Sequence, residues 1–182
     1  MKKHTVIFVT NRYSSVLELL YSDPDIVLSG VIYSPVEEKS ASEMQLFISQ
    51  HNIPCYPSIN KFLNNCTEKP DFLAVYSFHK ILKEEEIKLP NIAAINLHPS
   101  LLPLYKGKNP WNEQFEAGEK ESGFTVHKIT EDIDNGPILL QKSYFIDYNL
   151  SYSSIIEYAV TTVGAPLLCH VIKNFNKLQL KK

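Results

Sequence analysis

The chain has 182 residues, of which 44% are hydrophobic and 21% charged, and its formal net charge at pH 7 is -2. This length and composition predict one globular domain with a single core and exclude a disordered chain. The acidic balance argues against broad electrostatic capture of nucleic acid, and three cysteines without a Cys-x-x-Cys pair indicate neither a disulfide framework nor a zinc knuckle.

The first half of the sequence alternates short β-rich runs with amphipathic stretches. The apolar run at residues 6–9 is too short for a signal sequence, so we interpret it as a strand and expect a cytoplasmic protein with no membrane partner. The predicted strands are residues 5–9, 26–33, 53–56, 71–76 and 92–98. The predicted helices are residues 14–20, 43–50 and 59–63. This alternation is typical of an α/β fold, a Rossmann-like domain with a mostly parallel sheet flanked by helices.

The pattern changes after His98, where prolines and a glycine produce a turn-rich segment. Asn109 and Pro110 are typical of a helix N-cap and first helical position, and Gly118 is expected to end that helix. Two more strands are predicted at residues 123–129 and 138–145. A last helix is expected to follow Ser151 and run into the 170s, with Pro166 able to kink it. No repeat or long linker divides the chain, so we expect residues 1–182 to form one domain.

Three polar residues stand out as candidates for catalysis. Asn96 and His98 are two residues apart on a strand, so both side chains lie on one face at its carboxyl end, where open α/β sheets bind ligands. An amide can stabilise an oxyanion, and an imidazole can move a proton near pH 7. Asp134, in the acidic turn before the last strand, is placed to orient His98 and raise its pKa. By spacing alone, a structural hydrogen-bonding pair and an ordinary turn explain the same residues.

The surrounding sequence resembles the folate-dependent formyltransferases, which act on glycinamide ribonucleotide, methionyl-tRNA or amino sugars. The segments INLHPSLLPLYKG at residues 95–107 and GFTVHKITEDIDNGPILLQ at 123–141 carry this resemblance, which is dense over residues 71–141. It implies an N-formyltransferase that takes the formyl group of 10-formyltetrahydrofolate, with Asn96, His98 and Asp134 as its catalytic residues. It also implies that His127 lies near the catalytic aspartate. His98, His127 and Asp134 could also form a zinc site, but nothing in the resemblance implies a metal.

The same resemblance places the folate. Its pterin ring is expected between residues 75–82 and the turn at 130–134, because a planar heterocycle needs backbone groups at its rim and apolar side chains on its faces. The predicted folate-binding residues are Val75, Phe78, His79, Lys80, Ile81, Leu82, Thr130, Glu131, Asp132 and Ile133. Without the resemblance, plain core packing would explain Ile81 and Leu82.

The acceptor amine is less well defined. The glycinamide ribonucleotide branch cradles its substrate phosphate in a glycine-rich loop after the first strand, whereas residues 10–15 here contain no glycine. Arg12 and the amides of Ser14 and Ser15 are alternative anion ligands. Residues 106–112 are more similar to amino-sugar and tRNA formyltransferases, with Trp111 either a platform for a sugar or base or a buried helix anchor. The predicted acceptor-binding residues are Arg12, Ser14, Lys108, Asn109, Trp111 and His127.

We expect the acceptor to be a small amine. An amino-sugar nucleotide is the first choice, and glycinamide ribonucleotide is the alternative. A tRNA substrate would ordinarily require a further C-terminal domain and a basic surface, and this chain ends soon after its last predicted helix with a net charge of -2. Two other functions remain open: hydrolysis of the same folate, and a non-catalytic folate-binding module. The sequence leaves the oligomeric state undetermined, and a homodimer is compatible with it.

Overall fold

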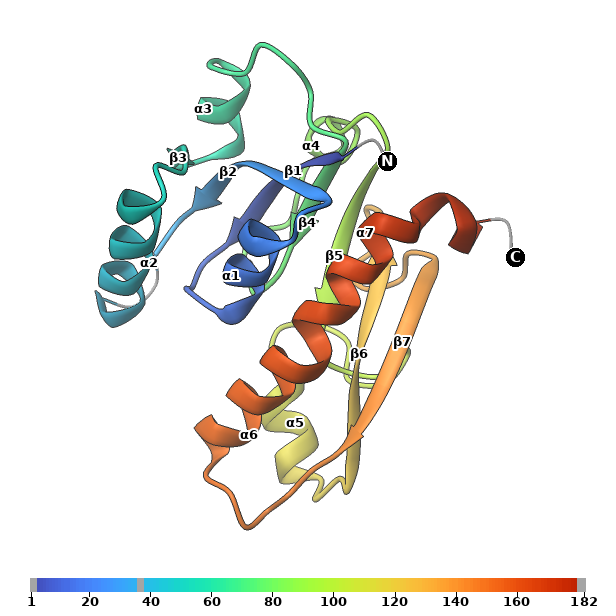
Figure 1. Cartoon of the computed structure of the whole chain (residues 1–182). Coiled ribbons are helices and arrows are strands. Elements are labelled where there is room, and N and C mark those ends of the chain that lie inside the picture. The colour runs from blue at the N-terminus through green and yellow to red at the C-terminus, as the bar shows by residue number, and fades with distance from the viewer. Residues whose placement is uncertain (1–2, 36–37, 180–182) are drawn as a thin grey trace.

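The computed structural model describes residues 3–35 and 38–179, and these form an α/β architecture (Figure 1). Its strands are β1 (His4–Thr10), β2 (Ile26–Tyr33), β3 (Cys55–Tyr56), β4 (Phe72–Val75), β5 (Ala93–His98), β6 (Glu121–Lys128) and β7 (Ile138–Phe145). Its helices are α1 (Ser15–Ser22), α2 (Glu38–Gln50), α3 (Ile59–Leu63), α4 (Glu84–Ile87), α5 (Pro110–Glu116), α6 (Tyr152–Ala159), the π-helix η1 (Val160–Gly164) and α7 (Ala165–Gln179).

The described strands form one sheet in the order β3-β2-β1-β4-β5-β6-β7. All pairs among strands β1 to β5 are parallel, whereas β6 pairs antiparallel with β5 and with β7. The sheet is therefore mostly parallel, as the sequence predicts. The carboxyl ends of β1, β4 and β5 lie at one edge, and this edge carries the candidate site.

Apolar residues cover both faces of the central strands. On β1, Val6 and Phe8 join the core under α1, α2, α6 and α7, while Ile7 and Val9 join a second cluster under α3 and α4. All four side chains are fully buried. A parallel strand covered by helices on both sides needs this continuous apolar run.

Some element boundaries differ from those predicted. Helix α2 begins at Glu38 and not at 43, because its first turns carry polar side chains that a hydrophobic period does not detect. Strand β3 is shorter than predicted, at two residues. The short helix α4 was not predicted, because none of its residues is buried and it leaves no apolar pattern. Asn109 and Pro110 occupy the expected N-cap and first-turn positions of α5, and Gly118 follows its end with a φ of 68°.

The C-terminal helical segment packs along the sheet (Figure 1). Its hydrogen bonding becomes π-helical at Val160–Gly164, just before Pro166, whereas the non-helical backbone angles lie further on, at Asn174. A proline inside a helix removes one backbone hydrogen bond, and the π-helical turn lies directly before this position. By length and composition alone, the helical segment Tyr152–Gln179 is able to cross a membrane, yet 61% of its most apolar stretch is buried inside the protein. Packing on the sheet accounts for this hydrophobicity.

Candidate active site

A cleft of about 260 Å³ opens at the carboxyl ends of β4 and β5. Asn96 and His98 reach it from β5, His127 from β6 and Asp134 from the turn before β7. The side chains of His98, His127 and Asp134 are 4%, 3% and 9% exposed. The structure thus brings together the three residues predicted to be catalytic, with His127 beside them. We call these four residues the catalytic cluster.

His98 has one ring nitrogen committed to the backbone. Its Nε2 lies 2.8 Å from the carbonyl oxygen of Tyr105, which can only accept, so Nε2 carries a hydrogen. Its Nδ1 lies 3.4 Å from Oδ2 of Asp134. The second proton of the imidazolium therefore resides on Nδ1, and Nδ1 is the nitrogen left for a bound molecule.

Asp134 is held from three sides. Its Oδ2 accepts the N–H of Gly107 at 2.9 Å, and its Oδ1 lies 3.3 Å from Nε2 of His127 and 3.4 Å from Nδ2 of Asn96. Its backbone is left-handed, with a φ of 51°, a conformation that Asp tolerates better than most residues. The turn is tight because the backbone of Gly136 passes close to the carbonyl oxygen of Lys128. A side chain on Gly136 would collide with this oxygen.

Asn96 and His127 are direct neighbours in the β5-β6 register. Nδ1 of His127 lies 2.9 Å from the carbonyl oxygen of Lys128, so this nitrogen carries a hydrogen. Its Nε2 lies 3.2 Å from Nδ2 of Asn96 and 3.3 Å from Oδ1 of Asp134, so Nε2 accepts from the amide in the neutral ring and donates to the carboxylate in the protonated ring. Nδ2 of Asn96 also lies 3.4 Å from Oδ1 of Asp134, so both N–H groups of this amide have partners within the catalytic cluster.

Burial and charge act in opposite directions on His98. Burial lowers the pKa of His98, and the Asp134 carboxylate with the Tyr105 carbonyl offsets only part of that fall. The predicted raising effect of Asp134 is present, but desolvation outweighs it. Burial also opposes ionisation of Asp134, yet His127, His98 and the Gly107 N–H together hold the pKa of Asp134 below its usual value. The result is an ionised carboxylate beside a histidine whose protonated ring has an unusually acidic N–H.

One arm of the cleft, the folate arm, is formed by the predicted folate-binding residues. All ten line the cleft: Val75, Phe78, His79, Lys80, Ile81, Leu82, Thr130, Glu131, Asp132 and Ile133. Ile81 and Ile133 are 69% and 53% exposed, so core packing does not explain them, whereas Leu82 is buried in the second core cluster. Two exposed aliphatic side chains at a cleft are suited to the faces of a planar ring.

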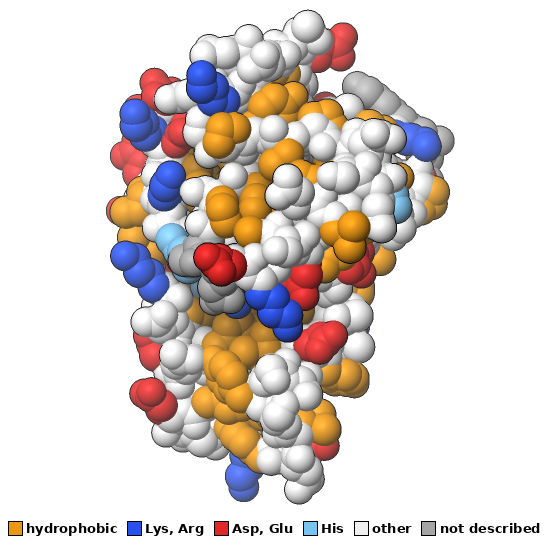
Figure 2. Space-filling model, turned by 90° about the vertical axis from the view of Figure 1, so that its left-hand side faces the viewer, with side chains coloured by type: hydrophobic (Ala, Val, Ile, Leu, Met, Phe, Trp, Pro, Cys, Tyr) orange, Lys and Arg blue, Asp and Glu red, His pale blue; other side chains and the backbone are white. Residues whose placement is uncertain are grey.

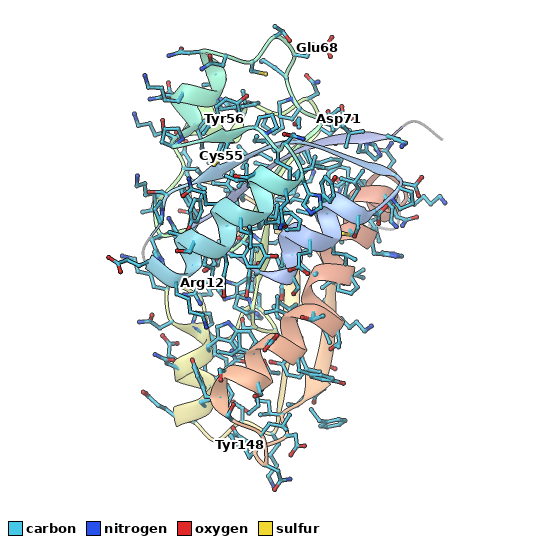
Figure 3. All side chains as sticks on the ribbon, turned by 60° about the vertical axis from the view of Figure 1, so that its left-hand side comes forward. Arg12, Cys55, Tyr56, Glu68, Asp71 and Tyr148 are labelled. Atoms are coloured by element: carbon cyan, nitrogen blue, oxygen red, sulfur yellow. The ribbon has the colours of Figure 1, made fainter. Side chains whose placement is uncertain are left out.

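The other arm, the acceptor arm, is formed by Arg12, Tyr76, Lys108 and Trp111. Figure 3 shows Arg12 between the α1 and α2 region and α5. Of the predicted acceptor-binding residues, Ser14 and Asn109 do not line the cleft. They are the N-cap residues of α1 and α5, respectively.

The loop after β1 uses its backbone N–H groups internally. The N–H of Asn11 donates to the carbonyl of Ser77 at 2.8 Å, that of Arg12 to the Thr10 hydroxyl at 3.2 Å, and that of Tyr13 to the Ser40 hydroxyl at 2.7 Å. The Asn11 side chain also accepts the N–H of His79 and donates to the carbonyl of Ser34. Three amides that would cradle a phosphate in a glycine-rich loop are therefore already occupied.

Sequence reasoning missed three contributors to the site. Tyr105 and Gly107 act through their backbone, and both have positive φ, 54° and 98°. The glycine is a signal for such a turn, but nothing in the sequence shows that the Tyr105 carbonyl meets His98. Tyr76 was predicted only as part of the pterin-lining segment 75–82, and its place beside Trp111 was missed. Its buried hydroxyl accepts a hydrogen bond from Trp111, and burial raises the pKa of Tyr76 to about 12. Within residues 3–35 and 38–179, no group of three side chains is arranged to hold a metal ion.

Comparison with known sequences adds independent evidence. A model of the formyl transferase family matches residues 59–172. A methionyl-tRNA formyltransferase of Thermotoga neapolitana is 33% identical over 156 residues, covering 78% of this chain and 49% of that protein. The bifunctional polymyxin resistance protein ArnA of Wigglesworthia glossinidia brevipalpis is 34% identical over 167 residues, covering 87% of this chain and 24% of that protein. The chain thus spans about half or less of the length of these relatives.

Solved structures share the fold. The phosphoribosylglycinamide formyltransferase of Anaplasma phagocytophilum superposes with a TM-score of 0.73 at 25% identity, covering 91% of this chain and 83% of that one. A formyltetrahydrofolate deformylase of Pseudomonas syringae pv. tomato superposes with a TM-score of 0.72 at 22% identity, covering 96% and 62% of the two chains. At 22% identity the second likeness concerns the fold alone.

Proposed function

The chain belongs to the formyl transferase family, and from this premise we propose that it transfers the formyl group of 10-formyltetrahydrofolate to a primary amine of a small substrate. The observation that carries the proposal is the convergence of Asn96, His98 and Asp134 in one cleft, with the Nδ1 of His98 at 3.4 Å from the carboxylate. A cytoplasmic location is part of the proposal and agrees with the three free thiols among the described residues.

The chemistry follows from the positions of the N–H groups. The neutral amine attacks the formyl carbon, and the carbonyl oxygen becomes an oxyanion that accepts from Nδ2 of Asn96 and Nδ1 of His98. Collapse of this tetrahedral intermediate breaks the bond between the formyl carbon and the folate nitrogen. The amine loses one proton and the folate nitrogen gains one, and water beside the His98 and Asp134 pair carries this transfer. Asn96 must share its N–H groups between the oxyanion and its present partners, His127 and Asp134.

The electrostatics of His98 suit this role. Burial makes its N–H more acidic, and an acidic N–H donates a stronger hydrogen bond to a developing oxyanion. The ionised Asp134 favours the imidazolium as negative charge builds on the substrate. Turnover then requires protonated His98 and falls as pH rises through the pKa of His98 in the substrate complex.

For the acceptor, we propose an amino-sugar nucleotide in preference to glycinamide ribonucleotide. The loop after β1 has its amides at residues 11–13 occupied, so these three groups are not free to hold a phosphate there. Arg12 and Lys108 supply cations nearer to α5. A tRNA acceptor has its own support, because a methionyl-tRNA formyltransferase is 33% identical; against it stands the net charge of -2.

The test is an acceptor screen with the purified chain and 10-formyltetrahydrofolate. Amino-sugar nucleotides, glycinamide ribonucleotide, methionyl-tRNA and a no-amine control are compared by release of tetrahydrofolate and by the mass of the formylated product. We expect formylation of an amino-sugar nucleotide that requires both substrates. Formate release without amine would establish the hydrolase instead, and folate binding without turnover would establish a binding module. Preferred formylation of glycinamide ribonucleotide or of tRNA would overturn the acceptor assignment.

A further inference from the structure

A band of aromatic side chains continues the acceptor arm of the cleft. We call Trp111, Phe115, Tyr148 and Tyr152 the aromatic strip. Trp111 lines the cleft, and Phe115 lies one turn along the same face of α5. Phe115 makes edge contacts with Tyr152 and Tyr148, at ring-centroid distances of 4.7 Å and 5.7 Å. Figure 2 shows hydrophobic side chains gathered as a continuous band on the lower half of this face, where α5 and α6 lie.

The strip is exposed and yet held in place. Tyr148 and Tyr152 are 49% and 44% exposed, so packing in the core does not explain their position. Their hydroxyls are fixed, since Tyr152 donates to the Asn112 side chain and Tyr148 donates at 2.7 Å to the carbonyl of Glu119. Rings that are anchored at the hydroxyl and exposed to solvent present ready-made stacking surfaces.

Two cations lie at the cleft end of the strip. Arg12 lies close enough to the hydroxyls of Tyr76 and Tyr152 to interact electrostatically with both. Figure 3 places Arg12 above α5 and Tyr148 at the opposite, lower end of α5 and α6. Among the described residues, neither Arg12 nor Lys108 has a carboxylate within ion-pair distance, and both line the cleft. Unpaired cations at a cleft mouth attract an anionic ligand.

We propose that the aromatic strip with Arg12 and Lys108 binds the nucleoside diphosphate part of the acceptor, with the base stacked on the strip and the diphosphate on the two cations. This rests on the proposed function, because it assumes that the reacting amine enters at the catalytic cluster. Trp111 supports the proposal because it belongs both to the aromatic strip and to the lining of the cleft. A molecule bound on the strip can therefore reach the cleft beside Arg12. Stacking is tolerant of base identity, so the strip does not select one base.

The chain offers a reporter at the junction, because Trp111 is its only tryptophan. UDP is titrated into the folate-free protein while Trp111 emission is excited at a wavelength that UDP does not absorb. Uridine and inorganic pyrophosphate are titrated separately to test the base and the charge alone. We expect a saturable change with UDP and binding at least about tenfold weaker with either half. No saturable change with UDP at millimolar concentration, or pyrophosphate binding as tightly as UDP, would overturn the proposal.

Matched variants locate the binding. Arg12→Gln should weaken UDP binding about tenfold, through loss of a charge-assisted contact. Tyr152→Leu should weaken it by a similar factor, through loss of stacking. Lys61→Gln on α3 and Tyr158→Leu on α6 are the controls, since both residues are exposed and neither lines the cleft. UDP affinity that is unchanged in both test variants, or reduced equally in the controls, contradicts the assignment.

The measurement is separable from the activity assay, because UDP binding requires neither folate nor formyl transfer. If the chain formylates amines but Trp111 does not respond to UDP, the strip assignment fails and the proposed activity stands. If UDP binds and no amine is formylated, the nucleotide site stands and the proposed activity fails. Circular dichroism of each variant confirms that a loss of binding is not a loss of fold.

Discussion

The catalytic cluster and the acceptor arm lie in one cleft, but they are built in opposite ways. In the cluster, His98 and Asp134 are nearly fully buried, and backbone groups of Tyr105 and Gly107 fix them. In the acceptor arm, Arg12 and Lys108 are exposed side chains without a carboxylate partner among the described residues. Groups that could act as preorganised dipoles are thus buried and hydrogen-bonded, whereas the cations that could contact the acceptor are exposed side chains.

This contrast predicts a division between rate and affinity. Changes in the cluster should reduce kcat, because they remove interactions that strengthen in the transition state. Changes in the arm should raise KM for the acceptor with little effect on kcat, because the same contact exists before and during reaction.

The largest effect is expected from truncation of the oxyanion donors. His98→Ala and Asn96→Ala should each reduce kcat by about 100-fold or more, since each removes an N–H directed at the developing charge. Folate affinity, measured by calorimetry with a folate analogue, should change little. A large loss of folate binding with an unchanged kcat would assign these residues to the donor site and break the contrast.

Asp134→Asn should produce a smaller fall in kcat together with a shift in pH dependence. The amide keeps the shape but loses the negative charge that raises the pKa of His98, so that pKa falls further. Because turnover requires protonated His98, the alkaline decline of kcat moves to lower pH. A pH profile that keeps its position would show that Asp134 does not act through His98.

The sequence predicted part of this site, and the rest became clear only in the structure. The two-residue spacing of Asn96 and His98 was enough to place both side chains on one face. The position of Asp134 in the acidic turn suggested a link to His98, but an Asp-Asn-Gly turn is common in many proteins, and the family resemblance was needed to interpret Asp134 as catalytic. Its approach to His98 depends on the β6-β7 connection and on a left-handed backbone at the aspartate, which spacing does not reveal.

The supporting contacts show where sequence reasoning stops. The Asn96 and His127 pair depends on the antiparallel register of β5 and β6. The roles of Tyr105 and Gly107 belong to backbone atoms, which have no residue-type signature. The parallel strands of the first half were predictable because burial on both faces imposes continuous apolar runs, whereas α4 was missed because it buries no residue.

Gly107→Ala tests the backbone support with an intermediate effect. A Cβ at this position meets nothing within 4 Å, but the φ of 98° is unfavourable for alanine. Relief of a strain of about 1–2 kcal/mol would move the N–H that binds Asp134, so we expect kcat to fall roughly tenfold with a small change in melting temperature. Gly118→Ala is the control, because it carries a similar strain away from the cleft. Equal losses of kcat in both variants would show that Gly107→Ala acts by global destabilisation and not by moving the N–H that binds Asp134.

The smallest effect on turnover is expected from the acceptor arm. Arg12→Gln should raise KM for the acceptor about tenfold while kcat stays within about twofold, because Arg12 contacts the part of the acceptor remote from the reacting amine. Steady-state kinetics at saturating folate provide the comparison. A fall in kcat as large as that of Asn96→Ala would place Arg12 in the chemistry and remove the contrast.

The central claim, that His98 and Asp134 act as one unit in formyl transfer, is tested most directly by a double-mutant cycle. Single-turnover rates of formyl transfer to the acceptor found in the screen are measured for the wild type, His98→Ala, Asp134→Asn and the double variant. We expect the rate of the double variant to lie within about twofold of that of His98→Ala, because the carboxylate has no imidazolium left to support. Losses that multiply would contradict it and would assign Asp134 a role that does not depend on His98.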